Sequence, residues 1–369
     1  MDRATLDLLY AQARNADASK NIDPELERYI ARDIPSMLHV PVGDIDRIDA
    51  DIAFLGVPFE GMTTAGFHGS WPRGMHPAGD PTDPLGRTGA HLAPAAIRRG
   101  SSFYRMTLSR GYMAEYDMAV GDRLSFVDVG DAPLLHGTNE ECWETAATYV
   151  SKIVKQGAIP FVLGGDHTTP GFVLDGMHRV KPDRKIGVLV FDAHYDLWDQ
   201  PQIGPGSMWK RLFEIGALEP ENLVQVGHRG TGNYEHFQHF AKATGMPCYS
   251  MRAVEDRGID EVIAEAATHL NARVDVLYIS LDVDSIDPAS MPAQKYPDPG
   301  GLTMREFYRA IRQMVLTGPE LCGFENVCFS PAYDYKHHGA IAVARAHLEA
   351  AAALAARRRG DAWTTSGMH

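Results

Sequence analysis

The stretch that most constrains the fold is an apolar run at residues 188–191 that stops at three polar side chains. Asp192, His194 and Asp196 follow the run at every second position. Unbroken β-branched and apolar residues are typical of a parallel strand buried on both faces, and a period of two puts the polar groups on one side of an extended chain. Buried unpaired carboxylates are costly, so a divalent metal would explain them. Taken alone, local hydrogen bonding at a helix start explains the cluster equally well.

Two further apolar runs end in the same way. Residues 158–163 lead into Gly164-Gly165-Asp166-His167, and residues 274–280 lead into Asp282 and Asp284. Open α/β sheets build their sites at the carboxyl ends of their strands. Three strands that deliver acidic or imidazole groups there therefore predict a single metal centre.

Strand and helix patterns alternate along the whole chain. We therefore expect an α/β fold with three layers, α/β/α, around an open, mostly parallel sheet. The predicted strands are 51–57, 125–130, 158–163, 188–191, 223–227, 274–280 and 322–329, and the predicted helices are 138–156, 175–180, 233–244, 260–271 and 339–359.

Length and charge limit the function classes. A chain of 369 residues holds one large α/β domain or two ordinary ones, and its net charge of -13 disfavours nucleic acid and anionic membranes while permitting a small cationic substrate. Neither a signal sequence nor a long membrane-spanning run stands out. The four cysteines lack C-x-x-C spacing, so we expect reduced thiols in a cytoplasmic protein.

The metal-type motifs resemble those of a known family. G-G-D-H, D-A-H-x-D and S-x-D-V-D-x-x-D-P, in this order, are similar to the motifs of the ureohydrolases, which include arginase and agmatinase and act on guanidino substrates. The similarity runs from about Ile52 to about Ala352, and it implies the arginase/deacetylase-like fold and a trimer or hexamer. Weaker marks lie at residues 56–59, 89–98, 127–131, 299–303 and 330–334.

The resemblance also implies a ligand set for two divalent ions. Four carboxylates and two imidazoles offset the charge of two such ions, and this ligation fits Mn²⁺ and Ni²⁺ alike. Two ions lower the pKa of water from about 16 towards neutrality, which supplies hydroxide for attack on a guanidino carbon. By resemblance, Asp196 carries the proton to the leaving amine. One ion would take His167, Asp192, Asp196 and Asp282, and the other would take Asp192, His194, Asp282 and Asp284.

Three departures from the family pattern bear on the substrate. Residues 205–209 read Pro-Gly-Ser-Met-Trp where relatives have H-G-T-M-F, so a proton-shuttling histidine is missing. Cys328 replaces the carboxylate that pairs with the substrate guanidinium, and residues 293–296 read Ala-Gln-Lys-Tyr in place of G-T-G-T. Trp198 and Trp209 are candidate substrate contacts, because aromatic faces attract cations, although packing explains them equally well. The candidate acids that would compensate for Cys328 are Glu60, Asp199 and Glu325.

The predicted organisation has three parts: a helical arm at residues 1–45, a ureohydrolase domain at 46–359 and a flexible tail at 360–369. The arm packs on the surface or on a neighbouring subunit, or it closes over the pocket. Residues 60–88 form a lid-like loop rich in Gly and Pro, since long loops in compact domains are often functional. His68 in this loop is a candidate substrate contact, and His76 a candidate ligand or general acid.

These observations favour a hydrolase that releases urea or a substituted urea from guanidine, a small alkylguanidine or a biguanide such as metformin. One alternative is an ordinary agmatinase or guanidinobutyrase. Another is a weakly active subunit that supports a related partner in a heteromeric ureohydrolase. A third is a deacetylase-like enzyme with a single metal, which the presence of both His194 and Asp284 disfavours.

Overall fold

The computed structural model describes residues 36–61, 89–104, 106, 110–134, 138–201 and 203–363. Residues 1–35 of the predicted arm, most of the predicted lid loop with His68 and His76, and residues 364–369 lie outside this part of the chain. The predictions made for them stay predictions.

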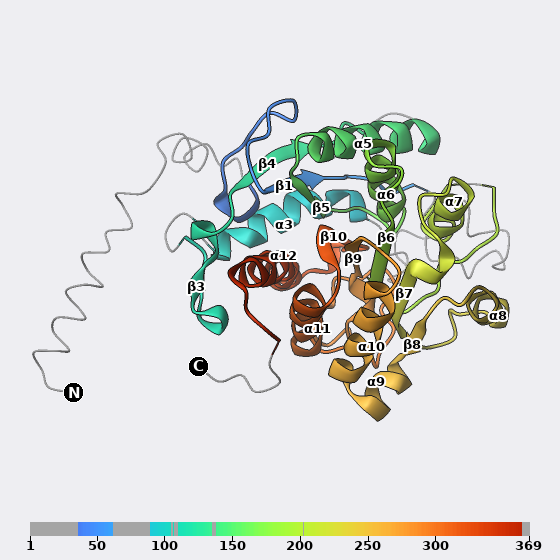
Figure 1. The fold of residues 1–369 in the computed structure, drawn as a ribbon. Coiled ribbons are helices and arrows are strands. Elements are labelled where there is room, and N and C mark those ends of the chain that lie inside the picture. The colour runs from blue at the N-terminus through green and yellow to red at the C-terminus, as the bar shows by residue number, and fades with distance from the viewer. Residues whose placement is uncertain are drawn as a thin grey trace, which may run out of the picture.

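A sheet of eight parallel strands forms the middle layer, which confirms the predicted fold class (Figure 1). The strand order is β4-β1-β5-β10-β9-β6-β7-β8, so β10 lies between β5 and β9. A separate antiparallel pair is formed by β2 (Tyr112–Met113) and β3 (Met118–Ala119). The strands of the main sheet are β1 (Ile52–Gly56), β4 (Phe126–Asp131), β5 (Ile159–Leu163), β6 (Ile186–Phe191), β7 (Leu223–His228), β8 (Cys248–Ser250), β9 (Val276–Asp282) and β10 (Glu320–Val327).

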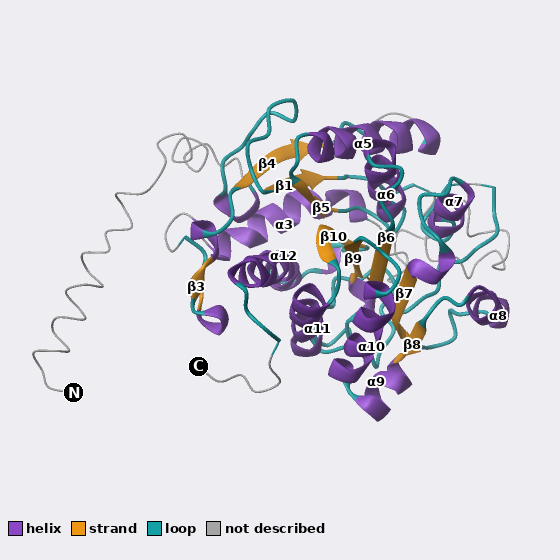
Figure 2. Ribbon diagram, in the orientation of Figure 1, coloured by secondary structure: helices purple, strands orange, loops and turns teal. Residues whose placement is uncertain are grey.

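Helices cover both faces of this sheet (Figure 2). One face carries α3 (Ala93–Ser101), α9 (Met251–Arg257), α10 (Ile259–Asn271), α11 (Met304–Thr317) and α12 (His338–Arg359). The other carries α5 (Asn139–Lys155), α6 (Thr169–Val180), α7 (Met208–Glu214) and α8 (Glu235–Thr244).

The central strands are mostly apolar because both of their faces are buried. In β5, Phe161 and Leu163 pack into the apolar cluster on the α12 side, while Val162 packs into the cluster on the α5 side. All three side chains are inaccessible to solvent. This is the burial expected for parallel strands between two helical layers.

Helix α12 is long and apolar enough to cross a membrane by length and composition. However, 83% of its most apolar 18-residue stretch is buried inside the fold. Its alanines, from Ala340 to Ala356, let it lie close to α3 and α11. The helix therefore forms part of the domain core.

The sequence reasoning missed several elements, of which α11 is the longest. Its start carries a capping box, in which the Thr303 side chain accepts from the backbone N–H of Glu306 and the Glu306 carboxylate accepts from the backbone N–H of Thr303. Phe307, Ala310 and Met314 then repeat at helical spacing and are buried. The T-x-x-E signal was present in the sequence.

Candidate metal centre

The predicted ligands meet where the central strands end at their carboxyl ends. His167 follows β5, Asp192 follows β6, and Asp282 is the last residue of β9. Nδ1 of His167 lies 3.0 Å from Asp192 Oδ2, 2.8 Å from Asp196 Oδ2 and 3.3 Å from Asp282 Oδ2. These four residues form the first group of candidate ligands.

A second group shares Asp192 with the first. Nδ1 of His194 lies 3.5 Å from Asp192 Oδ1 and 3.2 Å from Asp284 Oδ2. Candidate ligand atoms from Asp192, His194 and Asp284 all lie within 4.8 Å of one another, as do those from His167, Asp192 and Asp196. Two adjacent groups that share one carboxylate are the geometry needed for a pair of ions.

Backbone N–H groups orient three of the carboxylates. One oxygen of each accepts a hydrogen bond: Asp192 Oδ1 from His194 (2.7 Å), Asp282 Oδ1 from Asp284 (3.0 Å) and Asp284 Oδ1 from Ala193 (3.1 Å). The other oxygen, Oδ2, is the atom that approaches His167 or His194. The loops thus fix each carboxylate before any ion binds, which lowers the cost of assembling the site.

Two glycines let the His167 loop approach its neighbours. A Cβ on Gly164 would lie 2.3 Å from the Asn326 carbonyl oxygen, and a Cβ on Gly165 would lie 1.9 Å from that of Phe59. Only glycine fits at both positions. Both glycines of the G-G-D-H motif are therefore required, because Gly164 packs against β10 and Gly165 packs against the loop after β1.

The unsatisfied atoms of the centre fit a cation. Within the described part of the chain, Asp192 Oδ2 and both ring nitrogens of His167 are buried without a hydrogen-bond partner, although Asp192 Oδ2 and His167 Nδ1 are only 3.0 Å apart. Buried polar atoms normally have partners. Atoms that converge without bonding one another are the arrangement expected of oxygen and imidazole ligands for Mn²⁺ or Ni²⁺.

Electrostatics lead to the same conclusion. Burial raises the pKa of Asp282 well above its usual range, and the neighbouring Asp284 and Asp192 raise it further. Burial lowers the pKa of His167, but Asp192 and Asp196 outweigh this and raise it well above its usual value. The cluster therefore has excess negative charge, which bound cations would offset.

One side of the centre is open. The side chains of Asp196 and His194 are 16% and 22% exposed, whereas those of His167, Asp192 and Asp284 are 1% exposed. Asp196 also has a positive φ of 50°, a conformation that is rare outside glycine and tends to occur at functional sites. The candidate ligands are therefore most accessible to solvent on the side of Asp196 and His194.

Asn233 and Arg229 support the central loop, and the sequence reasoning missed both. Asn233 accepts a hydrogen bond from the backbone N–H of Tyr195 (3.0 Å) and donates one to the carbonyl of Ala193 (2.8 Å). Arg229 donates to the carbonyls of Asp284 (2.5 Å) and Pro299 (3.2 Å). Neither residue lies in a metal-type motif, so only the folded structure reveals their positioning role.

The structure places two of the predicted substrate contacts beside the ligands. Trp209 is fully buried and contacts the His167 ring edge-on, with the ring centroids 5.8 Å apart. Cys328 is buried and has a positive φ of 62°, and burial together with the nearby Asp282 carboxylate raises the pKa of its thiol well above the usual value. Trp198 packs on Tyr234 and Phe237, with centroid distances of 4.9 and 5.1 Å. Their roles towards a substrate stay predictions.

Of the three acids that are candidates to compensate for Cys328, Glu60 and Glu325 each keep one buried carboxylate oxygen without a hydrogen-bond partner among the described residues. Asp199 is 87% exposed and pairs with Lys210 on the surface. Glu325 lies within the sheet, where it accepts a hydrogen bond from Ser280 (2.8 Å), and burial raises its pKa to about 7. The Glu60 side chain is 8% exposed, and its Oε1 has no hydrogen-bond partner among the described residues.

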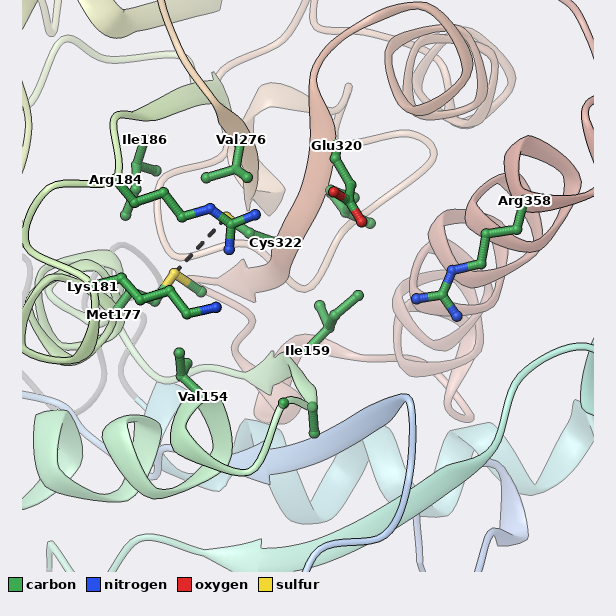
Figure 3. A pocket seen from close by; sticks show the side chains of 13 residues that line it. Val154, Ile159, Met177, Lys181, Arg184, Ile186, Val276, Glu320, Cys322 and Arg358 are labelled. Atoms are coloured by element: carbon green, nitrogen blue, oxygen red, sulfur yellow. Dashed lines mark hydrogen bonds between the residues drawn. The ribbon is translucent and has the colours of Figure 1, made fainter.

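A cavity of about 260 Å³ lies at the opposite end of the strands (Figure 3). Its wall includes the first residues of four strands, Ile159, Ile186, Val276 and Glu320. Lys181 and Arg184 also line it. Because the candidate ligands follow the other ends of these strands, this cavity is not part of the metal centre.

The chain is similar to proteins of one family. The Arginase family model matches residues 77–353. A formimidoylglutamase from Halalkalibacterium halodurans is 32% identical over 59% of this chain and 67% of its own length. A guanidinopropionase from Pseudomonas aeruginosa is 28% identical over 82% and 85%, and the human mitochondrial guanidino acid hydrolase is 29% identical over 93% and 90%.

Solved structures show the same fold. The formimidoylglutamase of Bacillus subtilis superposes with a TM-score of 0.73 at 22% identity, covering 88% of this chain and 93% of its own. Proclavaminate amidino hydrolase from Streptomyces clavuligerus gives a TM-score of 0.72 at 22% identity, covering 88% and 98%. The family match over most of the chain, together with the strand-end motifs, shows that this protein belongs to the arginase family of ureohydrolases.

Proposed function

We propose that the protein is a dinuclear metal-dependent hydrolase that cleaves a C–N bond of a guanidino-type substrate, giving urea or a substituted urea and an amine. The observation that carries the proposal is the pair of ligand groups that share Asp192. The names of several relatives, guanidinopropionase and agmatinase among them, support the substrate class.

The proposed ligands are the six residues of the two groups: His167, Asp192, His194, Asp196, Asp282 and Asp284. When bound, two divalent ions, Mn²⁺ or Ni²⁺, supply the charge that makes hydroxide available near neutral pH. The chain itself orients the ligand oxygens through the N–H groups of Ala193, His194 and Asp284. Two supported groups side by side favour a two-ion enzyme over a deacetylase-like site with one ion.

Asp196 is the proposed proton carrier. Its Oδ2 lies 2.8 Å from His167 Nδ1, and its side chain faces the open side of the centre. Burial and the neighbouring Asp192 raise its pKa, as suits a group that exchanges a proton. In the reaction the oxygen of water bonds to the guanidino carbon, the C–N bond breaks, and the proton passes through Asp196 to the departing nitrogen.

The altered residues favour a small or delocalised substrate: guanidine, an alkylguanidine or a biguanide such as metformin. Cys328 offers no carboxylate to a guanidinium beside Asp282, and Trp209 places an aromatic ring edge-on against the proposed ligand His167. Truncation of an ion pair of this kind costs about 2–5 kcal/mol, which would weaken binding of arginine or agmatine. An agmatinase-type enzyme is the conservative alternative.

The same alterations favour a second candidate, a weakly active subunit of a heteromeric ureohydrolase. Six intact ligand positions weigh against it, because an inactive subunit has no need of this much buried negative charge. We further propose a cytoplasmic homo- or hetero-oligomer, with no nucleic acid or membrane partner.

The test is urea or substituted-urea release by the purified chain, loaded separately with manganese and nickel. Arginine, agmatine, 4-guanidinobutyrate, guanidine, methylguanidine and metformin form the panel. Turnover of any of them by the chain alone supports the hydrolase. Two bound ions without turnover would refute it, and activity gained on adding a co-expressed related chain would support the subunit.

A further inference from the structure

A buried lysine lies beside the metal centre. Lys295 is 3% exposed, and its Nζ has no hydrogen-bond partner among the described residues. Its backbone N–H donates to the Cys328 carbonyl (3.2 Å). The adjacent Tyr296 faces the His194 ring, with the centroids 6.0 Å apart. The backbone of Lys295 thus contacts Cys328, and the next residue in the chain, Tyr296, contacts the proposed ligand His194.

The turn that carries Lys295 is fixed in place. The amide of Gln294 donates to the carbonyls of Val283 (2.9 Å) and Ile286 (2.6 Å), which flank Asp284. Gln294 also forms a β-bridge with Phe329, next to Cys328. The lysine is therefore held by the same loops that carry the ligands, and it is not a mobile surface cation.

Glu60 faces this lysine without bonding it. Glu60 Oε2 accepts a hydrogen bond from the backbone N–H of Gly89 (2.8 Å) and lies 2.8 Å from His91 Nδ1, whereas Oε1 has no hydrogen-bond partner among the described residues and lies 4.0 Å from Lys295 Nζ. This separation is too long for a hydrogen bond. A donor and an acceptor, both buried and both unsatisfied, are thus held apart, and such atoms are costly unless another group bonds them.

The chemistry of the pair limits what can bond it. An ammonium offers only donors, and so does a guanidinium, so a simple guanidinium can donate to Glu60 but offers Lys295 no acceptor. A carbonyl oxygen or a nitrogen lone pair next to an N–H can accept from Lys295 and donate to Glu60 at once. Carbamoyl-substituted guanidines and biguanides have this donor–acceptor unit, and methylguanidine lacks it.

We infer that Lys295 and Glu60 are a specificity pair that selects guanidines conjugated to a hydrogen-bond acceptor. The inference rests on the proposed hydrolase and narrows its substrate. Lys295 binds the acceptor, Glu60 binds the adjacent N–H, and the scissile carbon is thereby directed to the open side at Asp196. Simple alkylguanidines are disfavoured because they leave Lys295 without an acceptor.

The test compares carbamoylguanidine and biguanide with methylguanidine, using wild-type enzyme and Lys295→Met. In wild type, kcat/KM is expected to be at least tenfold higher for the two acceptor-bearing compounds. Lys295→Met should raise their KM at least tenfold with a smaller change in kcat, and should improve methylguanidine. Lys295→Arg, which keeps the charge, should retain part of the preference. Lys152→Met is the matched control, since Lys152 pairs with Asp46 on the surface.

Different outcomes separate the two proposals. If wild type releases no urea from any compound while two ions are bound, the hydrolase itself fails. If wild type turns over methylguanidine as well as the conjugated compounds, the specificity pair fails and the hydrolase stands. A uniform fall in kcat for every substrate in Lys295→Met, with a lower Tm, would show a structural lysine and would also overturn the inference.

Discussion

Exchange of Asp192 for asparagine is expected to abolish binding of both ions, whereas the same exchange at Asp196 or Asp284 abolishes binding of one. Asp192 belongs to both ligand groups, Asp196 to the first and Asp284 to the second. Asparagine has nearly the same shape, and its Oδ1 can keep the hydrogen bonds from His194 to position 192 (2.7 Å) and from Ala193 to position 284 (3.1 Å). Differences between the variants then report on ion binding and not on folding.

The expected size of the Tm shift follows from the linkage between ion binding and folding. An ion present at about 100 times its Kd stabilises the folded state by about 2.7 kcal/mol. For roughly 300 described residues, an unfolding entropy of about 2.1 cal/mol/K per residue converts this into about 4 °C of Tm per ion. Wild type should thus gain about 9 °C on loading, the single-site variants about 4 °C, and Asp192→Asn almost nothing.

The assay is thermal unfolding of chelated and metal-loaded protein, with the metal content of each sample measured by elemental analysis. Chelated samples provide the control for any effect of the substitutions on the fold itself. An Asp192→Asn variant that retains two ions, or that gains as much Tm as Asp284→Asn, would refute the shared-ligand arrangement.

Three further predictions concern residues outside the proposed ligand set. Arg98 binds both oxygens of the buried Asp128 (2.8 and 2.9 Å), and Arg98→Met removes the only charged partner of this carboxylate among the described residues. The free energy of unfolding in urea titrations should therefore fall by about 3–5 kcal/mol. A loss below about 1 kcal/mol would contradict this. Asn233→Ala should weaken metal affinity by about 10–100-fold through the loosened loop, as competition with a chelator would show, and unchanged affinity would contradict the positioning role. Burial lowers the pKa of His347 to about 3, whereas its value in the unfolded chain is about 6.5. The contribution of His347 to stability is therefore present above the pKa of the unfolded chain and is lost as the pH falls towards the pKa of the folded protein. His347→Gln should thus reduce the fall in the free energy of unfolding between about pH 6.5 and pH 3, as denaturant titrations at a series of pH values would show. An equally steep fall in wild type and variant would exclude this cause.

The sequence predicted those parts of the molecule that local patterns determine. The apolar runs before His167 and Asp192 indicated buried parallel strands, and the eight-stranded sheet confirms the fold. The end of β9 was placed two residues early, at 280 and not at Asp282, because a strand that ends in carboxylates looks like a loop. Helix α11 was missed although its capping residues were visible.

Contacts between residues far apart in the chain could not be predicted from the sequence. The departure at residues 293–296 was noted, but nothing local indicated that Lys295 is buried opposite Glu60, more than two hundred positions earlier in the chain. The same holds for Asn233, whose partners lie in the loop after β6. Such contacts depend on how the strand ends are ordered in the sheet, which local periodicity does not specify.

The position of β10 has a consequence for the order in which the protein can be completed during synthesis. Among the described strands of the sheet, β10 is synthesised last, yet it lies between β5 and β9. His167 follows β5 in the chain, and Asp282 is the last residue of β9. Until it arrives, both neighbours have an unpaired edge there, and the ligands are not yet held at their final spacing. We therefore expect the complete ligand set to form only after β10 has been synthesised, and until then the nascent chain has an exposed sheet edge of the kind that favours association with other chains.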